Sequence, residues 1–143
     1  MEIEEVIQAF CRRLRVDPPE RDGEGRYGFV FDGELTVRCE ALGSGGILLT
    51  GVPGRVPGRA GDAEALLRRL LTVNLAGMRE RRGVLCLEDG GDIVLYRTVS
   101  AGAVTPGDFE DIMERFVNEL AFWTDMVKET AGPAAPSPAV LFP

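Results

Sequence analysis

Apolar residues recur at spacings of three and four in three segments, the period of an amphipathic helix. The first segment spans residues 2–15 and ends before Pro18, because the residue before a proline disfavours helical backbone. The second begins near Asp62, a good N-cap, and Gly77 is a candidate for its end. The apolar stripes are Ile3, Val6, Ile7, Phe10 and Leu14 in the first helix, and Ala63, Leu66, Leu67, Leu70, Leu71, Asn74 and Met78 in the second.

The third helix has the clearest start signal. Thr105 is the predicted N-cap, Pro106 the first helical residue, and Asp108 the partner that completes a capping box. Val104 and Phe109 are spaced as a hydrophobic staple. The helix is expected to reach about residue 130, with an acidic outer face. Its apolar stripe consists of Phe109, Ile112, Met113, Phe116, Val117, Leu120, Trp123 and Val127.

Short β-strands are predicted between turns rich in glycine. The predicted strands are residues 26–31, 35–40, 47–52, 84–87 and 93–99. Asp32-Gly33 is a strong hairpin signal, and glycine-rich stretches at 43–46 and 88–92 predict two further hairpin turns. Residues 53–61 include two prolines and several glycines, so we expect an irregular connection there.

The element order is therefore α-βββ-α-ββ-α, which predicts an α+β fold in which a twisted antiparallel sheet packs with three helices. One domain is expected over residues 1–130. Residues 131–143 contain four prolines and predict a flexible Pro/Ala-rich tail. Several strands are apolar on both sides, so the second face of the sheet needs a cover. That cover is either a second chain or the fully wrapped domain itself, and both interpretations stay open.

Composition excludes several kinds of chemistry. The chain has 16 Lys and Arg against 23 Asp and Glu, and this charge of −7 argues against a nucleic-acid surface. It has no His, which removes Ser-His-Asp and Cys-His nucleophile pairs and His-ligated zinc. Cys11, Cys39 and Cys86 form no CxxC motif and are interpreted as small buried apolar side chains in a reducing compartment. We therefore predict no enzyme, no catalytic residue, no cofactor and no metal.

Local clusters have plain structural interpretations. The glycines at 43–46 and 90–91 fit hairpin turns better than phosphate loops, because neither precedes a helix. The acidic residues at 88–92 favour a solvated turn over a cation site, and the arginines at 79–82 favour a cationic helix end over an anion contact. No signal peptide and no membrane association are expected, because no apolar run approaches the ~20 residues of a membrane span. A cytosolic location is expected.

Three motifs resemble a known family. LLRRLLTVNLAG at 66–77 is similar to its LLxxLLxxN helix, and VLCLEDGGDIVLYRTV at 84–99 is similar to the hairpin that follows it. FVNELAFWTDMV at 116–127 matches its long acidic terminal helix. With the order α-βββ-α-ββ-α, residues 1–130 resemble a class I type III secretion chaperone of the Tir-chaperone (CesT-like) family.

The resemblance implies a non-enzymatic homodimer in the bacterial cytosol. Such a chaperone binds the N-terminal region of a secretion effector in extended form and keeps it soluble and export-competent. A further partner compatible with the resemblance is the secretion-system ATPase. The implied dimer-interface residues are Leu66, Leu67, Leu70, Leu71, Asn74, Leu85 and Leu87. The implied effector-binding residues are Ile3, Val6, Phe10, Phe29, Phe31, Leu35 and Val37.

One alternative function stays open: a stand-alone protein of the same fold that acts as a regulatory or assembly factor outside secretion. The tail has two interpretations as well. It is a frayed terminus, or its apolar end at Val140-Leu141-Phe142 returns to an apolar groove and imitates the partner.

Overall fold

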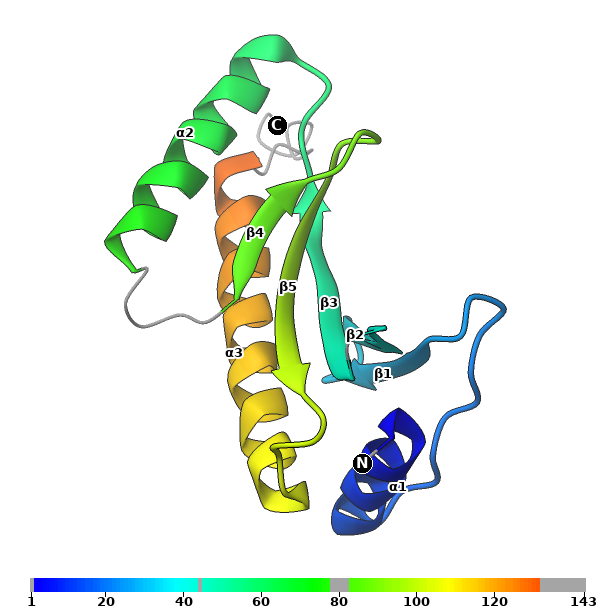
Figure 1. Cartoon of the computed structure of the whole chain (residues 1–143). Coiled ribbons are helices and arrows are strands. Elements are labelled where there is room, and N and C mark those ends of the chain that lie inside the picture. The colour runs from blue at the N-terminus through cyan, green and yellow to red at the C-terminus, as the bar shows by residue number, and fades with distance from the viewer. Residues whose placement is uncertain (1, 44, 78–82, 132–143) are drawn as a thin grey trace.

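The computed structural model describes residues 2–43, 45–77 and 83–131 (Figure 1). The predicted Met78 and the arginines at 79–82 lie outside the described residues, and so does the tail from residue 132. The helices are α1 (Ile3–Leu14), α2 (Ala60–Ala76) and α3 (Pro106–Ala131), and the strands are β1 (Tyr27–Phe31), β2 (Leu35–Ala41), β3 (Gly46–Arg55), β4 (Val84–Leu87) and β5 (Asp92–Ser100). The predicted order α-βββ-α-ββ-α is confirmed.

The five strands form one antiparallel sheet in the order β1-β2-β3-β5-β4. The hairpin between β1 and β2 turns at the predicted dipeptide, where Asp32 and Gly33 have φ angles of 53° and 75°. Positive φ at both central positions matches the right-handed twist of the flanking strands. The backbone N–H of Glu34 closes the turn by donating to the carbonyl of Phe31 at 3.1 Å. β1 and β4 are the two edge strands.

β3 is longer than the sequence predicts. The expected irregular connection from Pro53 is wrong at its start, because β3 continues to Arg55 and pairs there with Asp92. The pairing register with β5 shifts between Gly51 and Gly54, and such a bulge lets Pro53, which has no N–H, stay within the strand.

α2 also begins earlier than predicted. Its N-cap is Arg59, which makes no side-chain cap, and Asp62 lies in the first helical turn instead of at the cap. A carboxylate there is favourable because it faces the positive end of the helix dipole. Gly77 ends the helix as predicted, with φ of −102° and therefore without a left-handed cap.

The predicted start of α3 is confirmed. The backbone N–H of Asp108 donates to Thr105 Oγ1, and the N–H of Thr105 donates to Asp108 Oδ2, both at 3.1 Å. α3 crosses one face of the sheet close to β3, where a Cβ on Gly54 would lie 2.6 Å from Val127 Cγ1. α3 also contacts the start of β4, where the N–H of Gly83 donates to both carboxylate oxygens of Glu119 at 3.2 Å.

The core lies between α3 and the face of the sheet that includes Cys39, Leu49, Leu95 and the backbone of Gly51. α1 and the inner side of α2 add to the same core. The largest fully buried side chains are Trp123, Phe10, Phe109, Phe116, Ile7, Ile47, Leu49, Leu66, Leu95, Met113, Leu120 and Val37. Among the described residues no helix covers the opposite face of the sheet (Figure 1).

Candidate partner-binding surfaces

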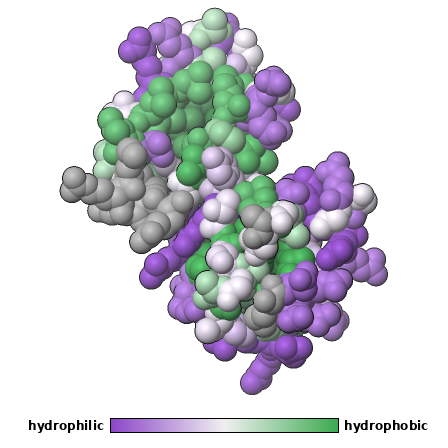
Figure 2. Space-filling model, viewed as in Figure 1, coloured by the Kyte–Doolittle hydropathy of each residue, from purple (hydrophilic) through white to green (hydrophobic). Residues whose placement is uncertain are grey.

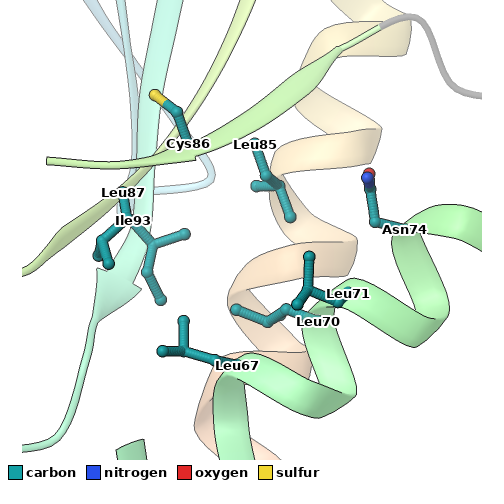
Figure 3. Close-up of a pocket in the computed structure, with 8 residues that line it drawn as sticks. All are labelled: Leu67, Leu70, Leu71, Asn74, Leu85, Cys86, Leu87 and Ile93. Carbon is teal, nitrogen blue, oxygen red and sulfur yellow. The ribbon is translucent and has the colours of Figure 1, made fainter. Parts of the chain in front are cut away.

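An apolar patch forms where α2 crosses the edge strand β4. It surrounds a pocket of about 130 Å³ whose lining comes from both elements and from the start of β5 (Figure 3). The lining residues are Leu67, Leu70, Leu71, Asn74, Leu85, Cys86, Leu87 and Ile93. Figure 2 shows hydrophobic residues gathered over the same elements. We call this surface the α2–β4 patch.

Large apolar side chains of the α2–β4 patch and its border face solvent. Leu71 and Leu75 are each 70% exposed, and Leu87 is 53% exposed. Val84, at the start of β4, is also exposed. An exposed cluster of this kind, in contrast to scattered single residues, marks an interaction surface.

The stripe predicted for α2 is divided between two environments. Leu66 and Leu70 are one turn apart and reach the domain core. The Leu71 side chain lies about 100° around the helix axis from that of Leu70 and therefore points away from the domain core. Leu71 therefore shares the predicted apolar stripe without belonging to the core, because the row formed by Leu66, Leu70 and Val73 packs α2 on the rest of the domain.

The structure brings together most of the predicted dimer-interface residues. Six of them line the pocket of the α2–β4 patch: Leu67, Leu70, Leu71, Asn74, Leu85 and Leu87. The seventh, Leu66, is fully buried in the core of its own chain. The prediction missed Cys86 and Ile93, which line the same pocket.

A second hollow, of about 270 Å³, lies where α1, the end of β1 and α3 meet. We call it the α1–α3 groove. Its lining residues are Phe10, Leu14, Phe31, Glu110, Met113, Glu114, Val117 and Asn118. Aromatic contacts hold its floor: the Phe10 ring lies 5.5 Å from that of Phe29 and 5.3 Å from that of Phe109, edge to face. Arg13 of α1 bonds Glu110 of α3 at 2.9 Å beside it.

The predicted effector-binding residues fall into two groups. Buried in the domain core are Ile3, Val6, Phe10, Leu35 and Val37. Phe29 and Phe31 are half-buried and pack against that core. Phe10 and Phe31 line the α1–α3 groove, whereas the other five residues do not reach it.

Sequence reasoning missed the contribution of α3 to this groove. Met113 is buried in the core as its place in the predicted stripe implies, but it also lines the groove together with Val117 and with Glu114 of the predicted acidic face. One signal was available, because Val117 widens the stripe beyond the positions that a single sheet contact requires.

The uncovered face of the sheet forms a broad open hollow of about 650 Å³. Its lining is mixed, because apolar and aromatic residues from the middle of the sheet (Leu48, Val52, Val94 and Tyr96) lie among the charged residues Arg26, Arg38, Glu40, Glu88 and Asp92. Cys86 also opens onto this face and is exposed, which corrects the prediction that all three cysteines are buried. The reason is its place on the edge strand β4, which no helix covers on that side. Cys11 and Cys39 are buried as predicted.

The resolved pKa shifts of the acidic groups belong to turns and caps. The backbone N–H of Arg26 donates to Asp22 and lowers the pKa of that carboxyl group. Hydrogen bonds from Thr105 lower the pKa of Asp108 in the same way. Burial raises the pKa of the Cys39 thiol to about 12.

In the described parts of the chain, no cluster of three or more His, Cys, Asp or Glu is placed to hold a metal ion. No described helix is long and apolar enough to cross a bilayer.

The model of the Tir chaperone protein (CesT) family matches residues 5–124, most of the chain. The chain belongs to the Tir chaperone (CesT) family. Both apolar surfaces therefore lie on a CesT-family chain. No curated protein matches this family member.

Solved structures share the fold of this CesT-family chain. The ExsC–ExsE complex superposes with a TM-score of 0.70 at 20% identity and covers 95% of this chain and 100% of that chain. The HopA1–SchA chaperone–effector complex gives a TM-score of 0.69 at 15% identity, and the match covers 86% of this chain and 93% of that chain. The heterodimeric ExoU–SpcU complex from the type III secretion system of Pseudomonas aeruginosa gives 0.64 at 18% identity, with 86% and 98% covered. The predicted α+β secretion-chaperone fold is confirmed.

Proposed function

We propose that this chain is a homodimeric secretion chaperone of the bacterial cytosol. It binds the N-terminal chaperone-binding segment of a type III secretion effector in extended form and keeps that segment soluble and export-competent. It acts by binding alone, without catalysis and without a cofactor. The presence of two separate exposed apolar surfaces on a CesT-family fold is the observation on which the proposal rests.

The α2–β4 patch is assigned to the second copy. Leu71 and Leu75 are exposed on α2, and Leu87 is exposed on the edge strand β4. Two copies related by a two-fold axis can therefore bury the same residues against each other. Burial of apolar side chains supplies the main favourable term in such an association. The secretion-system ATPase remains a proposed later partner of the loaded dimer.

The α1–α3 groove and the neighbouring edge of the sheet are assigned to the effector segment. β1 is an edge strand, and its first residue, Tyr27, is bridged by Arg21 of the preceding loop. An extended segment can add to the rest of this edge by main-chain hydrogen bonds and place side chains in the adjoining groove. Phe10 and Phe31 then contact the segment in the groove, Phe29 contacts it along the edge of β1, and the buried residues Ile3, Val6, Leu35 and Val37 pack beneath these aromatic rings.

Capture in the native host tests this function. The tagged chain is isolated from cytosol, co-purifying proteins are identified by mass spectrometry, and each candidate partner is then produced with and without its N-terminal region. The proposal expects one or a few secreted proteins whose binding disappears when that region is removed.

Two results would contradict the proposal. Binding that survives removal of the N-terminal region would show recognition of a folded domain instead. A partner that is never exported would favour the regulatory or assembly factor of the same fold.

A further inference from the structure

The α1–α3 groove is apolar at its base and acidic along one wall. Phe10, Phe31, Met113 and Val117 supply the apolar lining, whereas Glu110 and Glu114 both project from α3. A hollow of about 270 Å³ is smaller than most ligand pockets and has room for a large side chain rather than for a folded element.

The charges around the groove do not cancel. Arg13 is bonded to Glu110 at 2.9 Å and so neutralises one of the two carboxylates. Glu114 is exposed, and no ion pair joins it to another residue of the described ranges. Residues 105–130 of α3 and its cap include seven acidic and two basic residues, within a chain of net charge −7. The groove lining itself includes no basic residue, so the Glu114 carboxylate is a negative charge that no lining residue neutralises.

We propose that the groove selects an extended segment in which one large apolar side chain is flanked by Lys or Arg. The apolar side chain enters the hollow between Phe31 and Val117, and the neighbouring cation lies against Glu114. The inference rests on the proposed function, because it specifies the kind of effector segment that this groove accepts. An acidic flank would instead place like charges side by side, which costs affinity and suppresses wrong partners.

A random linear peptide library displayed against the full-length protein tests this selection. We expect peptides in which an apolar residue is flanked by Lys or Arg to be recovered about five times as often as peptides in which it is flanked by Asp or Glu. That ratio corresponds to the free energy of one partly exposed ion pair. The variant Glu114→Lys should reverse the preference toward Asp and Glu. The variant Val117→Asp, in the lining itself, should remove the enrichment of apolar segments from the groove.

Asp89→Lys is the matched control, because it makes the same charge change in the exposed turn between β4 and β5, remote from α1 (Figure 1). It should keep the wild-type preference. A shift in Asp89→Lys equal to that in Glu114→Lys would assign the preference to net charge and overturn the inference. Apolar enrichment without charge preference, or enrichment unaffected by Val117→Asp, would also overturn it and leave the proposed function intact. Absence of any apolar enrichment would overturn both.

Discussion

Leu70 and Leu71 are neighbours in α2 but lie in opposite environments. Leu70 is 4% exposed and packs in the domain core, whereas Leu71 is 70% exposed on the α2–β4 patch. A substitution at one of them therefore tests the fold, and the same substitution at the other tests the interface.

Leu71→Asp should convert a dimer into a folded monomer of 15.5 kDa. The carboxylate is solvated in the free chain but would be buried without a partner in the dimer. The substitution therefore weakens dimerisation and leaves the free energy of folding of the single chain unchanged. Sedimentation gives the mass, and circular dichroism checks that the helices are retained.

Leu70→Asp is the matched control for that variant. It puts the same carboxylate into the core, and we expect a loss of at least about 3 kcal/mol in the free energy of unfolding, as for large core deletions. If the Leu71→Asp protein still sediments as a dimer, the assignment of the α2–β4 patch as the dimer interface is wrong.

Close packing of α3 on β3 predicts a large effect at Gly54. In Gly54→Ala the new methyl group would lie 2.6 Å from Cγ1 of Val127, a stiff β-branched side chain in the core. We expect about 1–3 kcal/mol of destabilisation in urea denaturation. Gly58→Ala is the control, because nothing lies within 4 Å of the added atom. Equal stability of the two variants would contradict the described packing.

The capping box of α3 predicts a pH-dependent contribution from Asp108. Hydrogen bonds from Thr105 lower the pKa of this carboxyl group in the folded chain, so its ionised form stabilises the fold. The contribution is complete above the unfolded pKa of about 3.9 and is lost as the pH falls through the lower folded value. The difference in thermal midpoint between wild type and Asp108→Ala should therefore be largest near neutral pH and shrink at strongly acidic pH. A difference that grows on acidification would exclude this cap.

The cysteines should differ in reactivity. Cys86 is exposed and is expected to react first with a thiol reagent, whereas burial raises the pKa of Cys39 to about 12 and removes its thiolate at neutral pH. The Cys86 side chain points onto the uncovered face of the sheet, away from α2, so burial of the α2–β4 patch in a dimer should leave its labelling equally fast in wild type and in Leu71→Asp. Mass spectrometry of labelled peptides reads both rates. Labelling of Cys39 ahead of Cys86 would contradict the burial pattern.

The order of elements could be predicted from the sequence because its signals are local. The stripe of α3, the capping box at Thr105 and the turn at Asp32-Gly33 each act within a few residues, and all are observed. The continuation of β3 past Pro53 could not be predicted, because a bulge that absorbs a proline depends on the partner strand β5.

The candidate surfaces could be predicted only in part. The family resemblance implies an interface on the leucine-rich stripe of α2, but which of its leucines face outward depends on how α2 is rotated against α3. The exposure of Cys86 depends on β4 being an edge strand, which the alternation of side chains does not encode. The α1–α3 groove needs α1 and the first half of α3 to meet, a contact across about a hundred residues that the Arg13–Glu110 ion pair marks.

Hydrogen exchange on the complex with the captured partner's N-terminal segment tests the central claim most directly. The account predicts slower exchange in α1, in β1 around Phe29 and Phe31, and in the first half of α3 when the segment binds. The turn at residues 88–92 should not change. Protection confined to that turn, with the edge of β1 unaffected, would contradict the assignment of the groove and of the extended segment it is proposed to hold.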